Sequence, residues 1–252
     1  MTVAVLKIIE GQESAEGINQ TYLMLIPKVK DPTLVSQFRP INLCNVLYKI
    51  ASKVVANRLK VVLPGIISAE QSALVPGRLI MDNIIVAYEC LHFMKRNRAI
   101  KHRHCALKLD MMKAYDRVEW DYLRAIMSKL GFLERWADNV MNLVTSVSYS
   151  VLFNGKRLDE FRPSRGLRQG DPISPYLFLL SAEGLSCLLK SLDQSSQIDG
   201  IQVASSAPLV NHLLFADDSL LFFKANGSGA MEVSNLLESY CQALGQKINA
   251  TK

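Results

Sequence analysis

Residues 212–223, HLLFADDSLLFF, contain the strongest indication of how this chain folds. Its apolar runs lie on either side of the acidic pair Asp217-Asp218. Short apolar runs separated by a polar turn predict two antiparallel strands joined as a hairpin. A second acidic position, Asp110, ends the strand-like run 105–109 in LKLDMMKAYDRV. Carboxylates beside apolar strands are costly unless a cation or a basic group compensates them.

Three carboxylates that converge on one sheet edge predict a divalent-cation site. Asp110, Asp217 and Asp218 supply the hard oxygen donors that Mg²⁺ prefers. Two such ions could polarise an attacking hydroxyl, steady a pentavalent phosphorus and support a pyrophosphate leaving group. The alternative for Asp217-Asp218 alone is an ordinary polar turn, in which Asp is common. The strand ending in Asp110 favours the metal site.

Composition bounds the class of protein. The 252 residues carry 29 Lys+Arg against 23 Asp+Glu, a net charge of +6, and 49% of them are apolar, which excludes a disordered chain. The basic balance is weak support for a polyanionic partner. No apolar run approaches the ~18 residues of a membrane span, and the start does not read as a signal peptide. Five scattered cysteines and four histidines without ligand spacing predict an intracellular protein with reduced thiols and no zinc.

Periodicity predicts a mixed chain of class α+β, with an antiparallel sheet packed on helices. Hairpin signals, above all Asn154-Gly155 between SYSVLF and KRLDEF, outnumber any regular βαβ alternation. The predicted strands are 21–26 and 105–109, and the predicted helices are 45–63 (stopped by Pro64-Gly65), 81–96, 120–130, 134–145, 172–192 and 229–244. The densest basic run, residues 95–104, is either a solvated loop or a contact for a polyanion.

Eight blocks in fixed order carry a family resemblance. They are LIPKVKDP, FRPINLCNVLYKIASKVVANRL, QSALVPGRLIMDNI, LKLDMMKAYDRVEW, SYSVLFNG, RGLRQGDPISPYLF, HLLFADDSLLF and GQKINATK. With them the chain resembles the reverse transcriptases of non-LTR (LINE-type) retrotransposons, most closely those of plants. The resemblance implies the fingers and palm of a right-hand polymerase, with fingers over 1–104, palm over 105–252, and the thumb absent.

The resemblance implies roles for residues of the palm. Asp110 and Asp217 would bind the catalytic metals, with Asp218 beside them and the carbonyl of Met111 as a further ligand. The implied cofactor is a pair of Mg²⁺ ions, with Mn²⁺ as a possible substitute. Tyr115 would lie under the incoming sugar and exclude a 2′-hydroxyl, although an ordinary core tyrosine is the alternative.

The resemblance also implies residues that bind substrate. Gln169 and Gly170 match the block that contacts nucleotide and template, and Arg39 matches a fingers residue that meets the triphosphate. Lys49 and Arg78 are weaker candidates, for which a plain surface charge is the alternative. Lys252 matches a lysine that assists pyrophosphate departure.

The implied function is RNA-directed DNA polymerisation, in which deoxynucleotides are added to a primer 3′-OH. The partners would be an RNA template, a DNA primer and deoxynucleoside triphosphates, with no membrane. Two alternatives stay open: an inactive, truncated retrotransposon remnant that only binds nucleic acid, and an intron maturase-type reverse transcriptase. A nucleotide cyclase is disfavoured by the RGLRQG block. The expected location is cytoplasmic and nuclear, the latter by family analogy.

Overall fold

The computed structural model describes residues 2–96, 104–194 and 198–249, which form two compact units. Unit 1 contains Met1–Lys60 and Tyr115–Phe178, and unit 2 contains Val61–Ala114 and Leu179–Lys252. Each unit therefore joins two segments that are distant in the sequence. The assignment of 1–104 to fingers and 105–252 to palm is a functional division, and it stays a prediction.

Unit 1 contains a four-stranded sheet in the order β2-β1-β4-β5. Its strands are β1 (Gln20–Pro27), β2 (Phe38–Cys44), β4 (Ser148–Phe153) and β5 (Lys156–Phe161). Because β1 pairs with β4 in parallel, this sheet is mixed and not wholly antiparallel. The predicted tight turn between β4 and β5 is confirmed, since Asn154 and Gly155 both have the positive φ angles, 49° and 76°, of a type I′ turn.

Unit 1 also contains helices, and two of its helices continue into unit 2. Unit 1 holds α1 (Thr2–Ile9), α4 (Trp120–Lys129), α5 (Glu134–Thr145) and three short 3₁₀ turns, η1 (Glu16–Ile18), η2 (Val35–Gln37) and η4 (Tyr115–Arg117). Two long helices, α2 (Val46–Ile66) and α6 (Ser174–Gln194), pass from one unit to the other. The predicted stop of α2 at Pro64-Gly65 is wrong, because the helix continues to Ile66. Leu63 and Ile67 are both buried there, so packing of the apolar face outweighs the helix-breaking tendency of proline.

Unit 2 contains a three-stranded antiparallel sheet in the order β3-β7-β6. Its strands are β3 (His104–Leu109), β6 (His212–Phe215) and β7 (Asp218–Lys224). The predicted hairpin is confirmed with a shift of one residue. Ala216 and Asp217 form the turn, and Asp218 is the first residue of β7, opposite Phe215.

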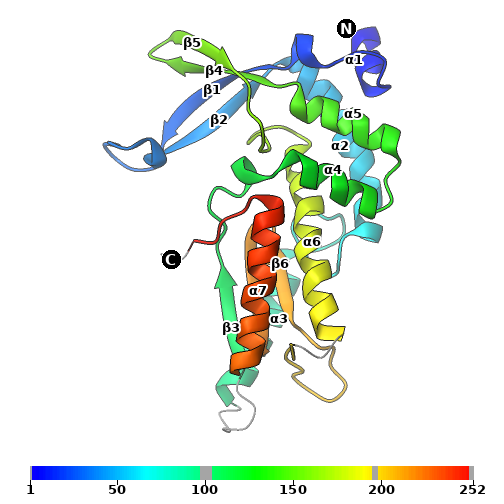
Figure 1. Ribbon diagram of the computed structural model, residues 1–252, viewed down its shortest axis with the longest axis vertical. Coiled ribbons are helices and arrows are strands. Elements are labelled where there is room, and N and C mark those ends of the chain that lie inside the picture. The colour runs from blue at the N-terminus through cyan, green and yellow to red at the C-terminus, as the bar shows by residue number, and fades with distance from the viewer. Residues whose placement is uncertain (1, 97–103, 195–197, 250–252) are drawn as a thin grey trace. The chain divides into compact units, whose positions relative to one another are not determined.

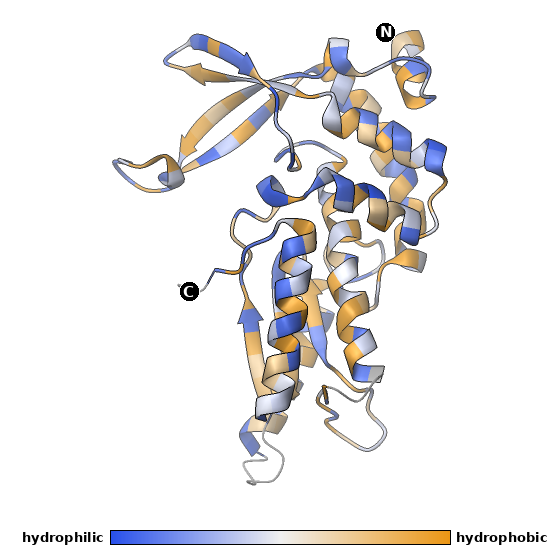
Figure 2. Cartoon of the chain, viewed as in Figure 1, coloured by the Kyte–Doolittle hydropathy of each residue, from blue (hydrophilic) through white to orange (hydrophobic). Residues whose placement is uncertain are grey.

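Helices pack on this sheet through apolar faces. On β7, Phe222 joins Leu213 of β6 and Cys90 of α3 (Ile80–Arg96) in a buried cluster. The last helix, α7 (Gly227–Leu244), buries residues at helical spacing, such as Val233, Leu237 and Tyr240, and its alternating hydropathy is visible in Figure 2. Figure 1 shows α6 and α7 side by side, where the Tyr240 hydroxyl donates to the Ser181 carbonyl.

In the parts of the chain that the structure describes, no helix combines the length and the apolar character that a bilayer span requires. Most of the basic run at 95–104 lies outside the described residues, and so does Lys252.

His212, on β6, is fully buried within unit 2. Its Nε2 lies 2.7 Å from Ser186 Oγ, and its Nδ1 lies 2.5 Å from Asn211 Oδ1. Burial lowers the pKa of His212 to about 4; Glu70 opposes this shift, whereas Lys190 adds to it. The folded chain therefore keeps this imidazole neutral at a pH where an exposed histidine takes up a proton.

We expect the free energy of unfolding to fall by roughly 2–3 kcal/mol between pH 7 and pH 4.5 on account of His212. The unfolded state binds the proton below a pH of about 6.5, whereas the folded state binds it only near pH 4, so acid favours unfolding in this window. Urea denaturation at both pH values measures the loss. His212→Gln should reduce it, and an equal loss in the variant and the parent chain would contradict the assignment to His212.

Candidate active site

The acidic pair lies at the tip of the β6–β7 hairpin. Asp217 and Asp218 are both exposed to solvent. Ala216, which precedes them, has a φ of 54°, in the left-handed region that costs free energy for any residue except glycine. Backbone strain of this kind occurs at functional sites where the surrounding structure enforces it. The turn is therefore held in an unfavourable conformation that presents two carboxylates.

Asp110 directly follows the neighbouring strand. Leu109, the last residue of β3, is paired with Ser219 of β7, so Asp110 lies at the same end of the sheet as Asp218. The segment after α7 orients the Asp110 carboxylate. Asn249 donates from Nδ2 to Asp110 Oδ2 at 2.9 Å, and its backbone N–H donates to the Asp110 carbonyl at 2.9 Å. Asn249 lies within the block GQKINATK and was not among the predicted site residues.

The Met111 carbonyl points away from the segment that contains Ile248. Met111 forms an antiparallel bridge with Ile248, and the hydrogen bonds of this bridge use the Asp110 carbonyl and the Met112 N–H. In such a pair the N–H and C=O of the central residue point away from the partner. The ligand role of the Met111 carbonyl stays a prediction.

The three aspartates lie near one another, but their side chains do not form a group that could hold a metal ion. Among residues 2–96, 104–194 and 198–249, no group of three or more His, Cys, Asp and Glu side chains lies close enough together to hold a metal ion. Asp110 is bonded to Asn249, and Asp218 forms an exposed ion pair with Lys108 at 3.6 Å. The structure thus brings Asp110 to the strand end beside the hairpin, but it does not gather all three carboxylates. The donors still suit Mg²⁺ by their chemistry, because all are hard oxygens.

Tyr115 and the RGLRQG block come together within unit 1. The Tyr115 ring stacks on Phe178, with centroids 4.9 Å apart and planes inclined by 10°. The Tyr115 carbonyl accepts a hydrogen bond from the Leu167 N–H at 2.8 Å, and the Gly166 N–H donates to Val118 at 2.8 Å. Tyr115 is therefore fixed both by ring stacking and by the loop that bears Gln169.

Replacing Gly166 with Ala should destabilise the fold by about 1–3 kcal/mol. Gly166 has a φ of 94°, and a Cβ there would lie 2.8 Å from the Asp116 carbonyl oxygen, so the backbone would have to move. Urea denaturation followed by circular dichroism measures the change. Gly17→Ala is the matched control, because a Cβ at Gly17 meets nothing within 4 Å. Equal stability of the two variants would refute the role of close approach.

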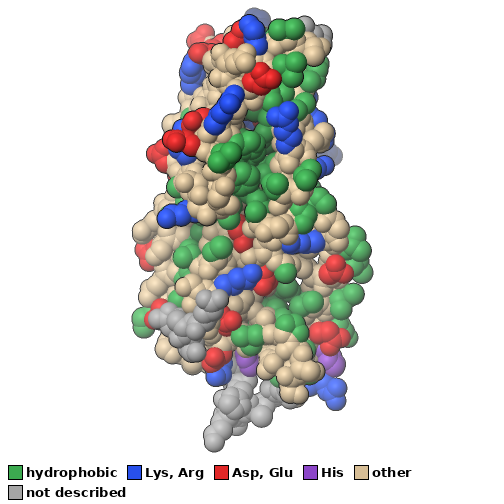
Figure 3. Space-filling view, turned by 90° about the vertical axis from the view of Figure 1, so that its right-hand side faces the viewer, with side chains coloured by type: hydrophobic (Ala, Val, Ile, Leu, Met, Phe, Trp, Pro, Cys, Tyr) green, Lys and Arg blue, Asp and Glu red, His purple; other side chains and the backbone are tan. Residues whose placement is uncertain are grey.

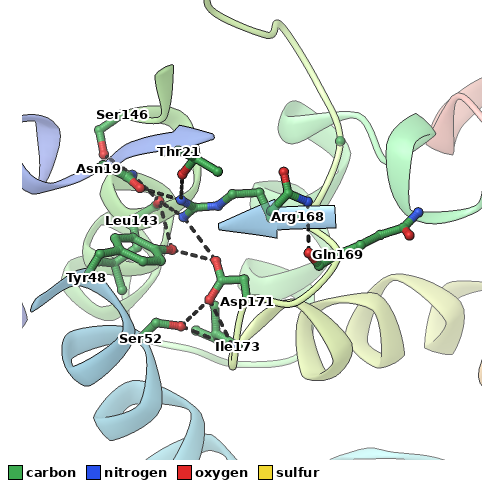
Figure 4. A network of polar contacts seen from close by, with 12 residues as sticks. Asn19, Thr21, Tyr48, Ser52, Leu143, Ser146, Arg168, Gln169, Asp171 and Ile173 are labelled. Atoms are coloured by element: carbon green, nitrogen blue, oxygen red, sulfur yellow. Dashed lines mark hydrogen bonds and ion pairs between the residues drawn. The ribbon is translucent and has the colours of Figure 1, made fainter. Parts of the chain in front are cut away.

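Gln169 and Gly170 lie between two charged residues that anchor the loop (Figure 4). Arg168 is only 4% exposed and forms a buried ion pair with Asp171 at 3.0 Å. Its guanidinium also donates to Asn19, Thr21 and the Leu143 carbonyl, and it stacks over the Tyr48 ring at 3.9 Å. The Gln169 carbonyl accepts from Asn42 Nδ2 at 2.9 Å.

Asp171 holds the other end of the loop. It accepts hydrogen bonds from the Tyr48 hydroxyl at 2.6 Å, from Ser52 Oγ and from the Ile173 N–H. Burial, followed by the Asp171 charge, raises the pKa of Tyr48 well above its ordinary value, so that its hydroxyl remains a donor. Arg168 and Asp171 were not among the predicted site residues, although a basic and an acidic residue three apart within one loop are a visible signal in the sequence.

The remaining predicted residues lie in different surroundings. Arg39 is exposed on β2 opposite Ile26, and Lys49 is exposed in the first turn of α2. In unit 2, Arg78 donates to the carbonyls of Ile67, Ser68 and Gln71 at 2.5–2.8 Å, so its guanidinium holds a loop of its own unit.

In unit 2, an antiparallel sheet carries two aspartates on a hairpin and a third at the end of the adjacent strand, which is the arrangement predicted for a polymerase palm. The profile of the family described as Reverse transcriptase (RNA-dependent DNA polymerase) matches residues 26–252. The chain therefore belongs to the reverse transcriptase family, and the predicted class of RNA-directed DNA polymerase is confirmed at this level. The family generally uses divalent metal ions and acts on an RNA template and a primer.

The chain is similar in sequence to retrotransposon proteins. It is 33% identical over 199 residues to the transposon TX1 uncharacterized 149 kDa protein of Xenopus laevis, with 79% of this chain and 15% of that protein covered. It is 30% identical over 234 residues to the retrovirus-related Pol polyprotein from the type-2 retrotransposable element R2DM of Drosophila melanogaster, with 91% and 20% covered. An uncharacterized mitochondrial protein of Arabidopsis thaliana is 50% identical over 68 residues, with 27% and 56% covered. The predicted likeness to non-LTR elements is thus confirmed, and the chain spans 15–56% of these relatives' lengths.

Solved structures support the predicted fold. The apo telomerase from Candida tropicalis truncated from its C-terminal domain matches with a TM-score of 0.63 at 16% identity, with 94% of this chain and 49% of that chain covered. Telomerase from the same organism in complex with the TWJ fragment of telomeric RNA matches with a TM-score of 0.64 at 15% identity, with 93% and 40% covered. The fingers-palm fold of class α+β is therefore confirmed.

Proposed function

We propose that this chain catalyses RNA-directed DNA synthesis, adding deoxynucleotides to a primer 3′-OH paired with an RNA template. The observation that supports this best is the position of Asp110 at the end of β3, paired through Leu109 and Ser219 with the strand that begins at Asp218. Two adjacent strands thereby bring carboxylates to the same end of the sheet. Carboxylates placed together in this way suit the positioning and charge stabilisation on which phosphoryl transfer depends.

Two Mg²⁺ ions, or Mn²⁺ in their place, are the proposed cofactors, held by Asp110, Asp217, Asp218 and the Met111 carbonyl. When bound, the ions would lower the pKa of the primer hydroxyl and stabilise charge on the phosphates. The protein's own contribution is to hold the carboxylates. Asn249 orients Asp110, and the strained turn at Ala216 presents Asp217.

Unit 1 supplies the proposed contacts to nucleotide and template. Gln169 and Gly170 would contact the base pair. The buried Arg168–Asp171 ion pair would support this role by fixing the loop that bears them. Tyr115 would select deoxynucleotides through its ring, which stacking on Phe178 holds in place. The exposed Arg39 and Lys49 would meet phosphates as part of the summed contacts that dominate nucleic-acid affinity. Figure 3 shows Lys and Arg side chains spread among hydrophobic ones over the face in view.

Four finer assignments belong to this proposal. Arg78 is bonded to loop carbonyls, which favours a supporting role over a direct triphosphate contact. Lys252 is proposed to assist pyrophosphate departure on the family resemblance alone. A plant element as the source is proposed because an Arabidopsis relative shares 50% identity over its matched segment. Work in the cytoplasm and nucleus is proposed on the family resemblance alone.

Primer extension tests the proposal. The chain is incubated with poly(rA)/oligo(dT), dTTP and Mg²⁺, beside the Asp217→Asn and Asp218→Asn double variant. We expect extension by the parent chain that the double variant lacks. A folded chain that binds the hybrid without extending it would instead support a remnant that only binds nucleic acid. Selective binding of one intron RNA would favour a maturase-type enzyme.

A further inference from the structure

The hairpin that bears the acidic pair is supported from its outer edge. β6 is the edge strand of the unit 2 sheet, so its outer backbone groups need partners elsewhere. Residues 70–72, here called the supporting segment, provide them. The Leu214 N–H donates to the Glu70 carbonyl at 2.8 Å, and the Ser72 N–H donates to the Leu214 carbonyl at 3.2 Å.

Gln71, the central residue of the supporting segment, reaches the turn itself. Gln71 is buried, with only 1% of the residue exposed. Its Oε1 accepts hydrogen bonds from the Ala216 N–H at 3.1 Å and from the Ala73 N–H at 3.0 Å. Because two N–H donors converge on this atom, it must be the amide oxygen. The Gln71 side chain thus bonds the one residue of the turn that has an unfavourable φ.

Further contacts hold the supporting segment in place. Arg78 donates to the Gln71 carbonyl at 2.8 Å, to the Ile67 carbonyl at 2.7 Å and to the Ser68 carbonyl at 2.5 Å. Asn83 Nδ2 bridges the Glu70 and Leu214 carbonyls at 3.0 and 2.9 Å. These bonds leave the Gln71 main chain little room to shift, so its amide oxygen is fixed relative to the turn.

We propose that Gln71 is a positioning residue of the acidic hairpin, with Arg78 fixing the main chain from which it acts. Its amide oxygen keeps Ala216 in the left-handed conformation, and this conformation sets the direction of the Asp217 carboxylate. An alanine turn residue would otherwise leave this region, since only glycine enters it without cost. The consequence for catalysis rests on the proposed function, whereas the conformational role of Gln71 does not.

Amide hydrogen exchange tests the conformational role without any assay of activity. In the ¹⁵N-labelled parent chain, the Ala216 amide should be protected, because it donates a partly buried hydrogen bond to Gln71. Gln71→Met, which keeps the length but removes the acceptor, should raise its exchange rate at least about 10-fold. Gln202→Met is the control, since Gln202 lies in an exposed loop of the same unit, where its side chain donates to the Ser205 and Ala207 carbonyls. Exchange of Ala216 in the parent chain at the rate of an unbonded loop amide would overturn the proposal, even if Gln71→Met did not fold.

Kinetics test the catalytic consequence. Gln71→Met should lower kcat for nucleotide addition by about 10- to 100-fold, with KM for the nucleotide little changed, because the carboxylate is misdirected after binding. Adding Ala216→Gly should restore most of the loss, since glycine needs no acceptor to adopt a positive φ. A lower melting temperature with unchanged kcat per folded molecule, or no rescue by Ala216→Gly, would reduce Gln71 to a structural residue. Absence of activity in the parent chain would count against the proposed function alone, because the exchange measurement is independent of it.

Discussion

Replacing Asp217 with Asn is expected to lower the rate of nucleotide addition by about 10³-fold, or roughly 4 kcal/mol of transition-state stabilisation. Asp217 is exposed in the turn of the β6–β7 hairpin, where the amide would keep the size of the side chain and remove its charge. A neutral amide is a much weaker partner for a divalent cation than a carboxylate. Single-turnover primer extension measures the rate, which separates chemistry from product release.

The same substitution should leave the fold intact. Asp217 lies in an exposed turn, so the melting temperature of Asp217→Asn should stay close to that of the parent chain. Asp199→Asn is the matched control. Asp199 is an exposed carboxylate of the same unit, paired with Lys224, and its loss should leave the rate unchanged. Full activity of the Asp217 variant would rule out the proposed metal site.

Replacing Arg168 with Met should destabilise the chain by about 3–5 kcal/mol, because it leaves the Asp171 carboxylate buried without its cation. The two side chains are 3% and 2% exposed and 3.0 Å apart, so solvent does not screen their interaction. The guanidinium also donates to Asn19 Oδ1 and Thr21 Oγ1, and both oxygens would lose this donor. Urea denaturation followed by circular dichroism measures the free energy of unfolding.

An exposed pair in the same unit provides the control for Arg168. Arg124 is paired with Asp138, but the two side chains are 48% and 50% exposed, so Arg124→Met should cost no more than about 1 kcal/mol. Asp171→Asn keeps the acceptor for Tyr48 and removes the charge. The double variant Arg168→Met, Asp171→Asn should lose about 0.5–3 kcal/mol less free energy of unfolding than the two single variants lose in sum. Strict additivity would show that the two residues are not coupled.

Elements whose signals are local could be predicted from the order of the amino acids alone. The apolar runs around Asp217-Asp218 predicted the hairpin, and Asn154-Gly155 predicted a type I′ turn with both φ angles positive. The strand before Asp110 was predicted by its apolar residues, and helix 134–145 was predicted with the bounds that α5 has. In each case residues within a few positions of one another supply the free energy that selects the conformation, so a short window of sequence contains the information. The order of the eight blocks then indicated the family.

Contacts between distant residues could not be predicted in this way and become visible in the folded chain. The partners of Arg168 include Asn19, 149 positions away, and burial makes that arginine an anchor instead of a surface charge. The Gln71 side chain bonds Ala216 across 145 positions, and Arg78, which the sequence suggested for substrate, proved to hold the Gln71 main chain. The parallel pairing of β1 with β4 and the continuation of α2 past Pro64 depend likewise on packing. Hydrogen bonds and desolvation between such distant segments exist only once the chain has folded, so neither periodicity nor turn chemistry reports them.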